Sequence, residues 1–275
     1  MKKILVPIDF SKHAEFAAVI ANKIAKKSGS RIYLLHLIEL PSSVVEISSS
    51  SRFSIPESML YLRKIKEKIV LFKERIFSKD IDVQHIIKLQ TPYEGILKYA
   101  KKLEVDLIIM GSKGHSKFEE ILIGSNTEKV VRASEAPVIV IKKDPDKFKL
   151  NNLVFVSNFE KDNTIAFEKF LTFANQFKSK IHLLTVNTPH KFENTFDAEL
   201  KIKNFISPYT LPSHSINVYN DHSVEKGVLN FLKNKNADLI ALSTHGRSGL
   251  SHLFNGSISK NLSKTALKPV LTFKI

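Results

Sequence analysis

A repeated glycine pattern holds the residues whose spacing most clearly points to chemistry. In its first copy Gly111 and Gly114 are followed, after nine further residues, by Gly124 and Ser125. Glycine has no side chain, so its backbone can approach a ligand closely or adopt a positive φ. A helix that opens at Gly124 and Ser125 would direct its first N–H groups and its positive dipole end at an anion. The pattern therefore predicts a cradle for a chain of phosphates.

The second copy of the pattern repeats this spacing with one change. Ser243 stands where the first glycine would be, and Gly246, Gly256 and Ser257 keep their places. The whole chain has nine glycines, and six of them fall in these two segments, with Gly249 as the sixth. Such economy indicates that the backbone requires glycine at these positions.

A purely structural interpretation of the same residues also explains part of the pattern. Gly111 and Gly114 could form a tight turn after a strand. Ser125 and Glu128 have the Ser-x-x-Glu spacing of a capping box, which would account for the serine without any ligand. Repetition of the pattern and its place after an apolar strand favour the ligand-binding interpretation.

The segments around the pattern alternate between two periodicities. Short apolar runs indicate buried strands, and segments whose apolar residues recur every third or fourth position indicate amphipathic helices. This alternation predicts a parallel α/β sheet with right-handed crossovers. In the first copy we expect strands at 4–8, 32–38, 83–89, 107–110 and 138–141, and helices around 16–27, 62–76 and 96–102 and after Ser125.

An internal repeat divides the chain into two copies of one design. Residues 4–10, 32–37 and 95–138 align without gaps with residues 153–159, 181–186 and 227–270. The first copy holds 17 extra residues in its middle. The serine-rich segment 41–58 contains this extra material, and we expect a flexible loop there before the long helix. The repeat predicts domains at 1–144 and 150–275.

Both copies resemble the universal stress protein domain. That domain is marked by Gly-x2-Gly-x9-Gly-Ser/Thr after the fourth strand and by an N-terminal Val-Pro-x-Asp-x-Ser, found here from Val6 to Ser11. The segment from Thr244 to Leu250 is also typical of the family. The resemblance covers nearly the whole chain. It implies two doubly wound, five-stranded parallel-sheet domains of the adenine nucleotide alpha-hydrolase-like class, with helices on both faces, packed as a pseudo-dimer within one chain.

The resemblance also implies a site for an adenine nucleotide, with ATP as the leading ligand and Mg²⁺ as an optional companion. Asp9 would accept hydrogen bonds from the ribose or the base, beside walls made by Pro7 and Leu37. An alternative role for Asp9 is that of a carboxylate stabilising the start of a helix. The phosphates would lie among Met110, Gly111, Gly114, Gly124, Ser125 and Asn126 in the first copy, and among Gly246, Arg247, Gly256 and Ser257 in the second.

The two copies depart from the family pattern in different ways. The first keeps its aspartate and all three glycines, although the pair Glu119-Glu120 adds negative charge between them. The second has Asn158 in place of the aspartate, Val156 in place of the proline and Ser243 in place of the first glycine. We therefore expect the better nucleotide site in the first copy. For the second copy the sequence leaves two interpretations, a weakened nucleotide site and a purely structural partner.

The last strand of each copy carries a further expectation. Residues 138–141 and 270–273 are short apolar runs that would end their sheets, and exposed sheet edges tend to pair. Such strands pair with each other across the domain interface in this family, and we expect the same pairing here.

Composition limits the remaining function classes. The 275 residues are 43% hydrophobic and 25% charged, as in ordinary globular domains. No run of 18 apolar residues occurs, which argues against a spanning helix, and the lack of cysteine excludes thiolate chemistry. The net charge of +15 favours anionic partners. Both halves carry part of this positive charge. In a protein that binds duplex DNA or RNA, the basic residues would instead be concentrated on one element.

The sequence offers no recognisable catalytic machinery. It contains neither a Gly-x4-Gly-Lys-Ser/Thr loop nor a Gly-x-Ser-x-Gly elbow, and its ten histidines show no metal-binding spacing. We therefore expect no catalytic residue, no metal site formed by side chains, and at most slow ATP hydrolysis.

These observations favour a cytoplasmic stress-response protein that binds an adenine nucleotide in its first domain and signals through unidentified protein partners. One alternative is a tandem scaffold that binds no nucleotide and acts through protein contacts and oligomerisation. Another alternative, motivated by the charge, is a factor associated with RNA or DNA. The leading hypothesis disfavours a nucleic-acid partner and includes no membrane partner. The sequence leaves open whether two tandem chains form a homodimer.

Overall fold

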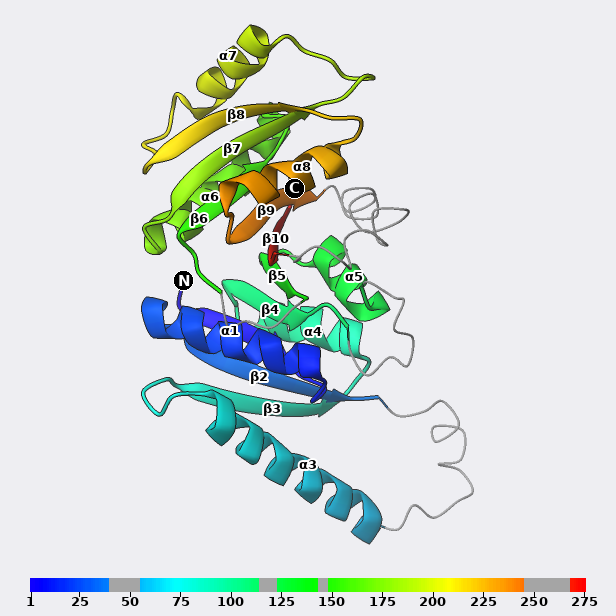
Figure 1. The fold of residues 1–275 in the computed structure, drawn as a ribbon. Coiled ribbons are helices and arrows are strands. Elements are labelled where there is room, and N and C mark those ends of the chain that lie inside the picture. The colour runs from blue at the N-terminus through cyan, green and yellow to red at the C-terminus, as the bar shows by residue number, and fades with distance from the viewer. Residues whose placement is uncertain (40–54, 114–122, 143–147, 245–267) are drawn as a thin grey trace.

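The chain alternates strands and helices through both halves (Figure 1). The computed structural model describes residues 1–39, 55–113, 123–142, 148–244 and 268–275. In the first half the elements are β1 (Lys3–Pro7), α1 (Lys12–Ser28), β2 (Arg31–Ile38), α3 (Ile55–Ile76), β3 (Val83–Leu89), α4 (Pro92–Lys102), β4 (Leu107–Gly111), α5 (Ser125–Ala133) and β5 (Val138–Ile141). In the second half they are β6 (Asn152–Val156), the 3-10 turn η1 (Lys161–Asn163), α6 (Thr164–Gln176), β7 (Lys180–Asn187), α7 (Thr195–Ile206), β8 (His214–Asn220), α8 (Val224–Lys235), β9 (Leu239–Thr244) and β10 (Val270–Lys274).

The strands predicted for the first half are confirmed, with ends that differ by one residue at most. Three helices begin earlier than predicted, and one of them is α1, which was expected around 16–27 and starts at Lys12. Helix α4 starts at Pro92, a residue suited to the first helical position because its missing N–H would have no partner there. Helix α3 starts at Ile55, so the prediction of a loop over 41–58 is wrong for residues 55–58. The rest of that segment lies outside the described residues.

The first and second halves form one continuous sheet. Its strand order is β3-β2-β1-β4-β5-β10-β9-β6-β7-β8, and all neighbours are parallel except β5 and β10. These two strands run antiparallel, with Leu271 opposite Ile139 and Thr272 opposite Val138. The predicted pairing of the last strands is therefore confirmed. Because they pair, the edges of the whole sheet are β3 and β8.

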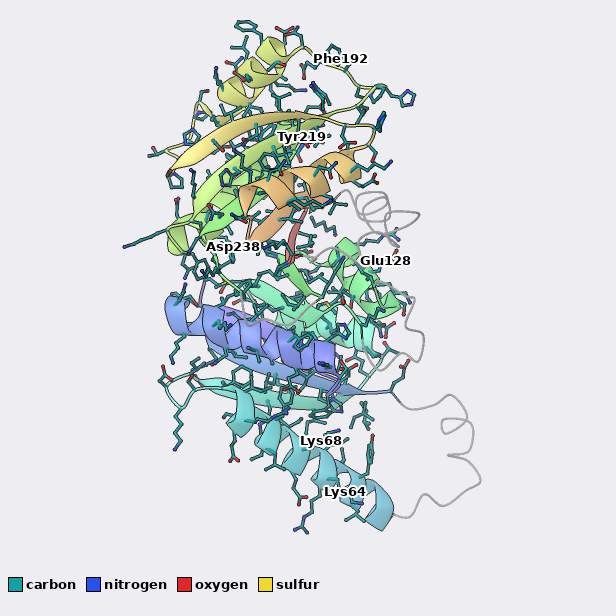
Figure 2. All side chains as sticks on the ribbon, viewed as in Figure 1. Lys64, Lys68, Glu128, Phe192, Tyr219 and Asp238 are labelled. Atoms are coloured by element: carbon teal, nitrogen blue, oxygen red, sulfur yellow. The ribbon has the colours of Figure 1, made fainter. Side chains whose placement is uncertain are left out.

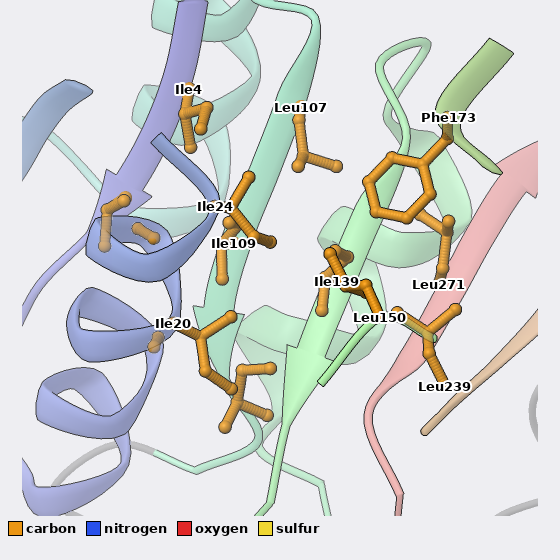
Figure 3. Packing of buried hydrophobic residues seen from close by; sticks show 14 of the residues in the cluster. Ile4, Ile20, Ile24, Leu107, Ile109, Ile139, Leu150, Phe173, Leu239 and Leu271 are labelled. Carbon is orange, nitrogen blue, oxygen red and sulfur yellow. The ribbon is translucent and has the colours of Figure 1, made fainter. Parts of the chain in front are cut away.

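Helices cover both faces of this sheet and enclose two apolar cores (Figure 1). One core packs α1, α3, α6 and α7 against side chains such as Ile4, Ile109 and Leu271 (Figure 3). The other packs α4, α5 and α8 against side chains such as Leu5 and Met110. Successive strand residues point to opposite faces, so neighbours such as Ile4 and Leu5 divide between the two cores. In the part of the chain that the structure describes, no helix is long and apolar enough to cross a membrane.

Helix α1 begins and ends at the residues that its sequence favours. Ser11 is its N-cap, and the serine hydroxyl accepts the Ala14 N–H at 3.2 Å. At the other end Gly29 adopts a φ of 68° and donates its N–H to the Ala25 carbonyl. A left-handed glycine of this kind ends many helices because it has no Cβ to clash. Helix α1 packs against β1 and β4.

Candidate functional site

A cavity of about 500 Å³ opens where β1 and β4 end side by side. The sheet extends from β1 to β2 on one side and from β4 to β5 on the other, so strand order reverses here, and open α/β sheets bind ligands at such points. Strands β1, β2 and β4 and the first turns of α4 and α5 form the wall. Eight residues predicted for the nucleotide site line it: Pro7, Asp9, Leu37, Met110, Gly111, Gly124, Ser125 and Asn126.

The part of the wall formed by β2 and α4 is apolar. Leu35 and Leu37 from β2 face Pro92 and Ile96 from α4 across this part of the cavity. A close approach of the two elements shapes it, because a Cβ at Gly95 would lie 2.6 Å from Leu37 Cδ1. A side chain at this position would require Leu37 to shift. Such a surface suits the flat, weakly polar face of a nucleobase.

The part of the wall formed by β4 and α5 is polar. The Gly124 N–H donates to the Ser112 carbonyl at 2.7 Å, and Thr127 Oγ1 donates to the Gly111 carbonyl at 3.0 Å. These bonds hold the first turn of α5 against the end of β4. Gly124 is the N-cap, and no side chain caps this helix. Ser125 is thus the first helical residue, so the capping-box interpretation of Ser125 and Glu128 is wrong.

Gly111 has a packing role that the sequence did not reveal. A Cβ at this position would lie 2.6 Å from the backbone carbonyl carbon of His13 in α1. Among the glycines that the structure describes, only Gly29 has a positive φ, so Gly111 is required by close approach. The neighbour that demands this approach is helix α1. This packing is sufficient to explain the glycine even before any phosphate is considered.

Asp9 lies in a tight turn between β1 and α1. Its Oδ1 accepts the Ser11 N–H at 2.9 Å, which stabilises the residue that caps the helix. Phe10, between them, has a φ of 63°, a conformation that is uncommon for a bulky residue and costs energy. Phe159 in the second domain has a φ of 53°, so the repeat keeps the strained turn. The alternative role of Asp9 at a helix start is thus present alongside its place in the cavity wall.

Three charged side chains line the cavity within the described residues: Asp9, Glu128 and Lys113. Glu128 lies on α5 (Figure 2) and pairs with Arg132 at 3.6 Å on the helix surface. Just behind the cavity, burial lowers the pKa of His13, and nearby Lys113 lowers it further. His13 is therefore held toward its neutral form in a neighbourhood that already contains a cation.

The corresponding position in the second domain is occupied by the protein's own polar side chains. Asn163, which is buried, donates from Nδ2 to Asn158 Oδ1 at 2.9 Å. The Ser243 hydroxyl donates to Asn163 Oδ1. In the repeat these residues correspond to Ala14, Asp9 and Gly111 of the first domain. The second domain has thus replaced small residues and a carboxylate by an internal hydrogen-bond network.

Some predicted site residues lie outside the described part of the chain. These are Gly114 in the first domain and Gly246, Arg247, Gly256 and Ser257 in the second, together with the pair Glu119-Glu120. The structure therefore brings together the first-domain residues from β1, β2, β4 and α5, and those of the second domain stay a prediction.

The cavity also contains residues that the sequence analysis missed. Leu35, Pro92, Ile96, Lys113 and Thr127 all line it. Leu35 could have been found from Leu37, because residues two apart on a strand share a face. The α4 residues carried no such signal, because their closeness to β2 depends on how the helix packs.

Comparison with known proteins identifies the family. The model of the universal stress protein family matches residues 1–142 and again residues 151–274. The chain belongs to the universal stress protein family. Two successive matches make it a tandem member with two domains.

Individual relatives agree with this assignment. The universal stress protein MJ0577 of Methanocaldococcus jannaschii is 32% identical over 160 residues, which cover 52% of this chain and 95% of that protein. A universal stress protein from Archaeoglobus fulgidus DSM 4304 has a crystal structure that covers 99% of this chain and 96% of its own, with a TM-score of 0.71 and 21% identity. It therefore shares the tandem fold. A universal stress protein in complex with cAMP covers 51% of this chain and 96% of its own at 18% identity and a TM-score of 0.37, too low a likeness to carry its ligand over.

Proposed function

We propose that the first domain binds an adenine nucleotide, with ATP foremost, and that the loaded protein signals through protein partners in a stress response. The observation that carries this proposal is the cavity at the ends of β1 and β4. It joins an apolar part to a polar part within about 500 Å³, a volume typical of small-ligand sites. A nucleotide has the same division between its base and its phosphates.

Each part of the ligand has a matching part of the wall. The base would pack against Leu37 and Ile96, and the phosphates would accept hydrogen bonds from the first N–H groups of α5. Asp9 lies on the same wall, and a carboxylate offers about four acceptor positions, so it can serve both the Ser11 N–H and a ribose hydroxyl. Mg²⁺ would be held mainly by phosphates and water, since the described residues contain no cluster of three acidic, histidine or cysteine ligands.

We assign the nucleotide to the first domain because of the network in the second. There Asn163 and Ser243 place side-chain atoms where the first domain has only Ala14 and Gly111. A ligand would have to displace these bonds and leave buried polar groups without partners, which costs free energy. The second domain would then act as a structural partner that completes the sheet. We retain 1–144 and 150–275 as the proposed domain limits.

Calorimetric titration of ATP tests the proposal, using protein first freed of co-purified nucleotide. We expect about micromolar binding, typical of a specific small-ligand site, at one site per chain. Asp9→Ala should weaken it by about tenfold, because a hydrogen bond to a charged group is lost. Gly124→Val should abolish it by placing a branched side chain at the first turn of α5.

The repeat supplies a matched control for this titration. Asn158 occupies the position of Asp9 in the second domain, so Asn158→Ala should leave ATP binding unchanged. Binding that survives both first-domain changes but is lost in Asn158→Ala would move the site to the second domain. An absence of binding in the unaltered protein would contradict the proposal and favour a scaffold that acts through protein contacts.

A further inference from the structure

Among the described residues that line the cavity, one is a cation, and it is not part of the glycine motif. Lys113 occupies a variable position between Gly111 and Gly114. The other charged lining residues are the carboxylates of Asp9 and Glu128. Without Lys113, the charged groups of this wall would present only negative charge to an anionic ligand. Lys113 therefore has a large influence on what the cavity accepts.

Backbone hydrogen bonds determine where the Lys113 side chain starts. The preceding residue, Ser112, donates its N–H to the Ile141 carbonyl at 2.8 Å and accepts the Gly124 N–H at 2.7 Å. Ser112 is buried, so these two bonds hold the chain firmly between the end of β5 and the first turn of α5. Lys113 consequently leaves the sheet beside the polar part of the wall, away from β2 and its apolar side chains.

We propose that Lys113 pairs with the phosphate chain of the nucleotide and sets the preference of this site for ligands with several phosphates. The inference rests on the proposed nucleotide site and goes beyond it, because it names the residue that distinguishes ATP from AMP or adenosine. The ammonium group of a lysine is attracted more strongly to a phosphate chain of higher negative charge. The base and the ribose would contact other parts of the wall.

His13 provides a second, independent readout. Its pKa is lowered by burial and by the charges of Lys113 and Lys12, and raised by Asp9. Removing the Lys113 charge should therefore raise the His13 pKa in the ligand-free protein. Bound phosphates should also raise it in the unaltered protein, because their negative charge offsets that of Lys113.

The experiment compares the affinities of ATP, AMP and adenosine for the unaltered full chain and for Lys113→Met, Lys113→Arg and Lys129→Met. Lys129 is the matched control, since this lysine of α5 lies with its Nζ 5.8 Å from the Tyr93 ring centre and does not line the cavity. We expect Lys113→Met to reduce the ATP-to-adenosine affinity ratio about tenfold, the size of one charge-assisted contact. Lys113→Arg should restore most of the ratio, and Lys129→Met should leave it unchanged. The His13 pKa is followed by NMR in the same samples.

Other outcomes would overturn the inference. The inference fails if the unaltered protein binds ATP but Lys113→Met weakens the binding of ATP and adenosine equally. It also fails if Lys113→Met changes neither affinity, because Lys113 then makes no contact that depends on the phosphates. An equal effect of Lys129→Met would show only a general influence of charge. If the unaltered protein binds none of the three ligands, the proposed function itself fails, and this result is distinct from the others.

Discussion

The two domains share one fold but differ in how they pack at one equivalent position, that of Gly111 and Ser243. In the first, Gly111 lies so close to helix α1 that a Cβ would come within 2.6 Å of the His13 backbone. In the second, the corresponding Ser243 has room for its side chain and bonds to Asn163. The helices explain the difference, because α1 begins at Lys12 whereas α6 begins at Thr164 after the short turn η1. Asn163, the last residue of η1, bonds to Ser243 there, whereas the equivalent Ala14 lies inside α1 and has no polar side chain.

This difference shows how two copies of a domain can keep one fold while their side chains differ at an equivalent position. Replacing a glycine by serine is harmless only if the facing helix start also changes. In the second domain it does, and the buried polar groups that result satisfy one another, as buried polar groups must. The first domain has kept small residues at these places and therefore an open cavity.

The largest effect is expected from exchanging residues between the domains. Gly111→Ser should lower the free energy of unfolding by about 3 kcal/mol, because the new Cβ meets backbone that cannot move aside easily. The reciprocal change, Ser243→Gly, should cost about 1 kcal/mol, since it removes one hydrogen bond to Asn163. Urea denaturation of both variants measures this. Equal costs for the two changes would contradict the account of the different helix starts.

A smaller effect on stability is expected from Lys142 than from Gly111. The equivalent of Lys142 in the second domain is Lys274, the last residue of β10. Burial lowers the pKa of Lys142 to about 7, while Lys274 is exposed at the end of β10. The folded state then binds fewer protons than the unfolded chain between pH 7 and the ordinary lysine pKa of 10.5, so stability should rise with pH across that range. Lys142→Met should remove this rise, so it should stabilise the protein more at pH 7 than at pH 10.

Lys274→Met is the matched control for this change. It should alter the free energy of unfolding by less than about 0.5 kcal/mol, as exposed substitutions usually do. Thermal or urea unfolding measured at several values of pH from 7 to 10 distinguishes the two. A flat stability profile in the unaltered protein would show that Lys142 keeps an ordinary pKa.

The smallest effect concerns one histidine in each domain. Burial lowers the pKa of both His13 and His182 from the ordinary value of 6.5. The unfolded chain therefore binds more protons below that value, and stability should fall as pH drops through 6.5 toward the folded pKa values. His13→Gln and His182→Gln should each make this fall shallower.

Added ATP sharpens the comparison of the two histidines. Only His13 lies beside the proposed cavity, whereas His182 contacts Ser215 and Asn152 on the second half of the sheet. In NMR titrations ATP should therefore move the His13 pKa and leave that of His182 in place. Equal shifts of both would indicate that the nucleotide is not confined to the first domain.

Much of the fold was predictable because its signals are local. Apolar periodicity located the strands, and Ser11 and Gly29 marked the ends of α1 through contacts within a few residues. The start of α3 was missed because the serine-rich stretch before it lacks the apolar spacing of its later turns. The cap of α5 was misassigned because Gly124 and Ser125 are both acceptable helix starts, and the bond from Gly124 to Ser112 favours the former.

The candidate site was predictable only in part. Leu37 and those motif residues of the first domain that the structure describes line one cavity, and Gly114 lies outside the described residues. Pro92, Ile96 and Lys113 were missed, because helix packing brings the first two to β2 and the third lies at a position that the motif leaves variable. The spacing of residues along the chain does not indicate which residues become neighbours in this way.

The sequence by itself determined the order of the elements, the division into two repeats and the presence of a glycine pattern typical of the universal stress protein family. These properties follow from residue type and short-range spacing. Only the tertiary structure decided why Gly111 must be glycine, which residues of β5 and β10 lie opposite one another, and that Ser243 and Asn163 bond to each other in the second domain. Each of these depends on contacts between residues about a hundred positions apart, which arise when helices pack onto a completed sheet.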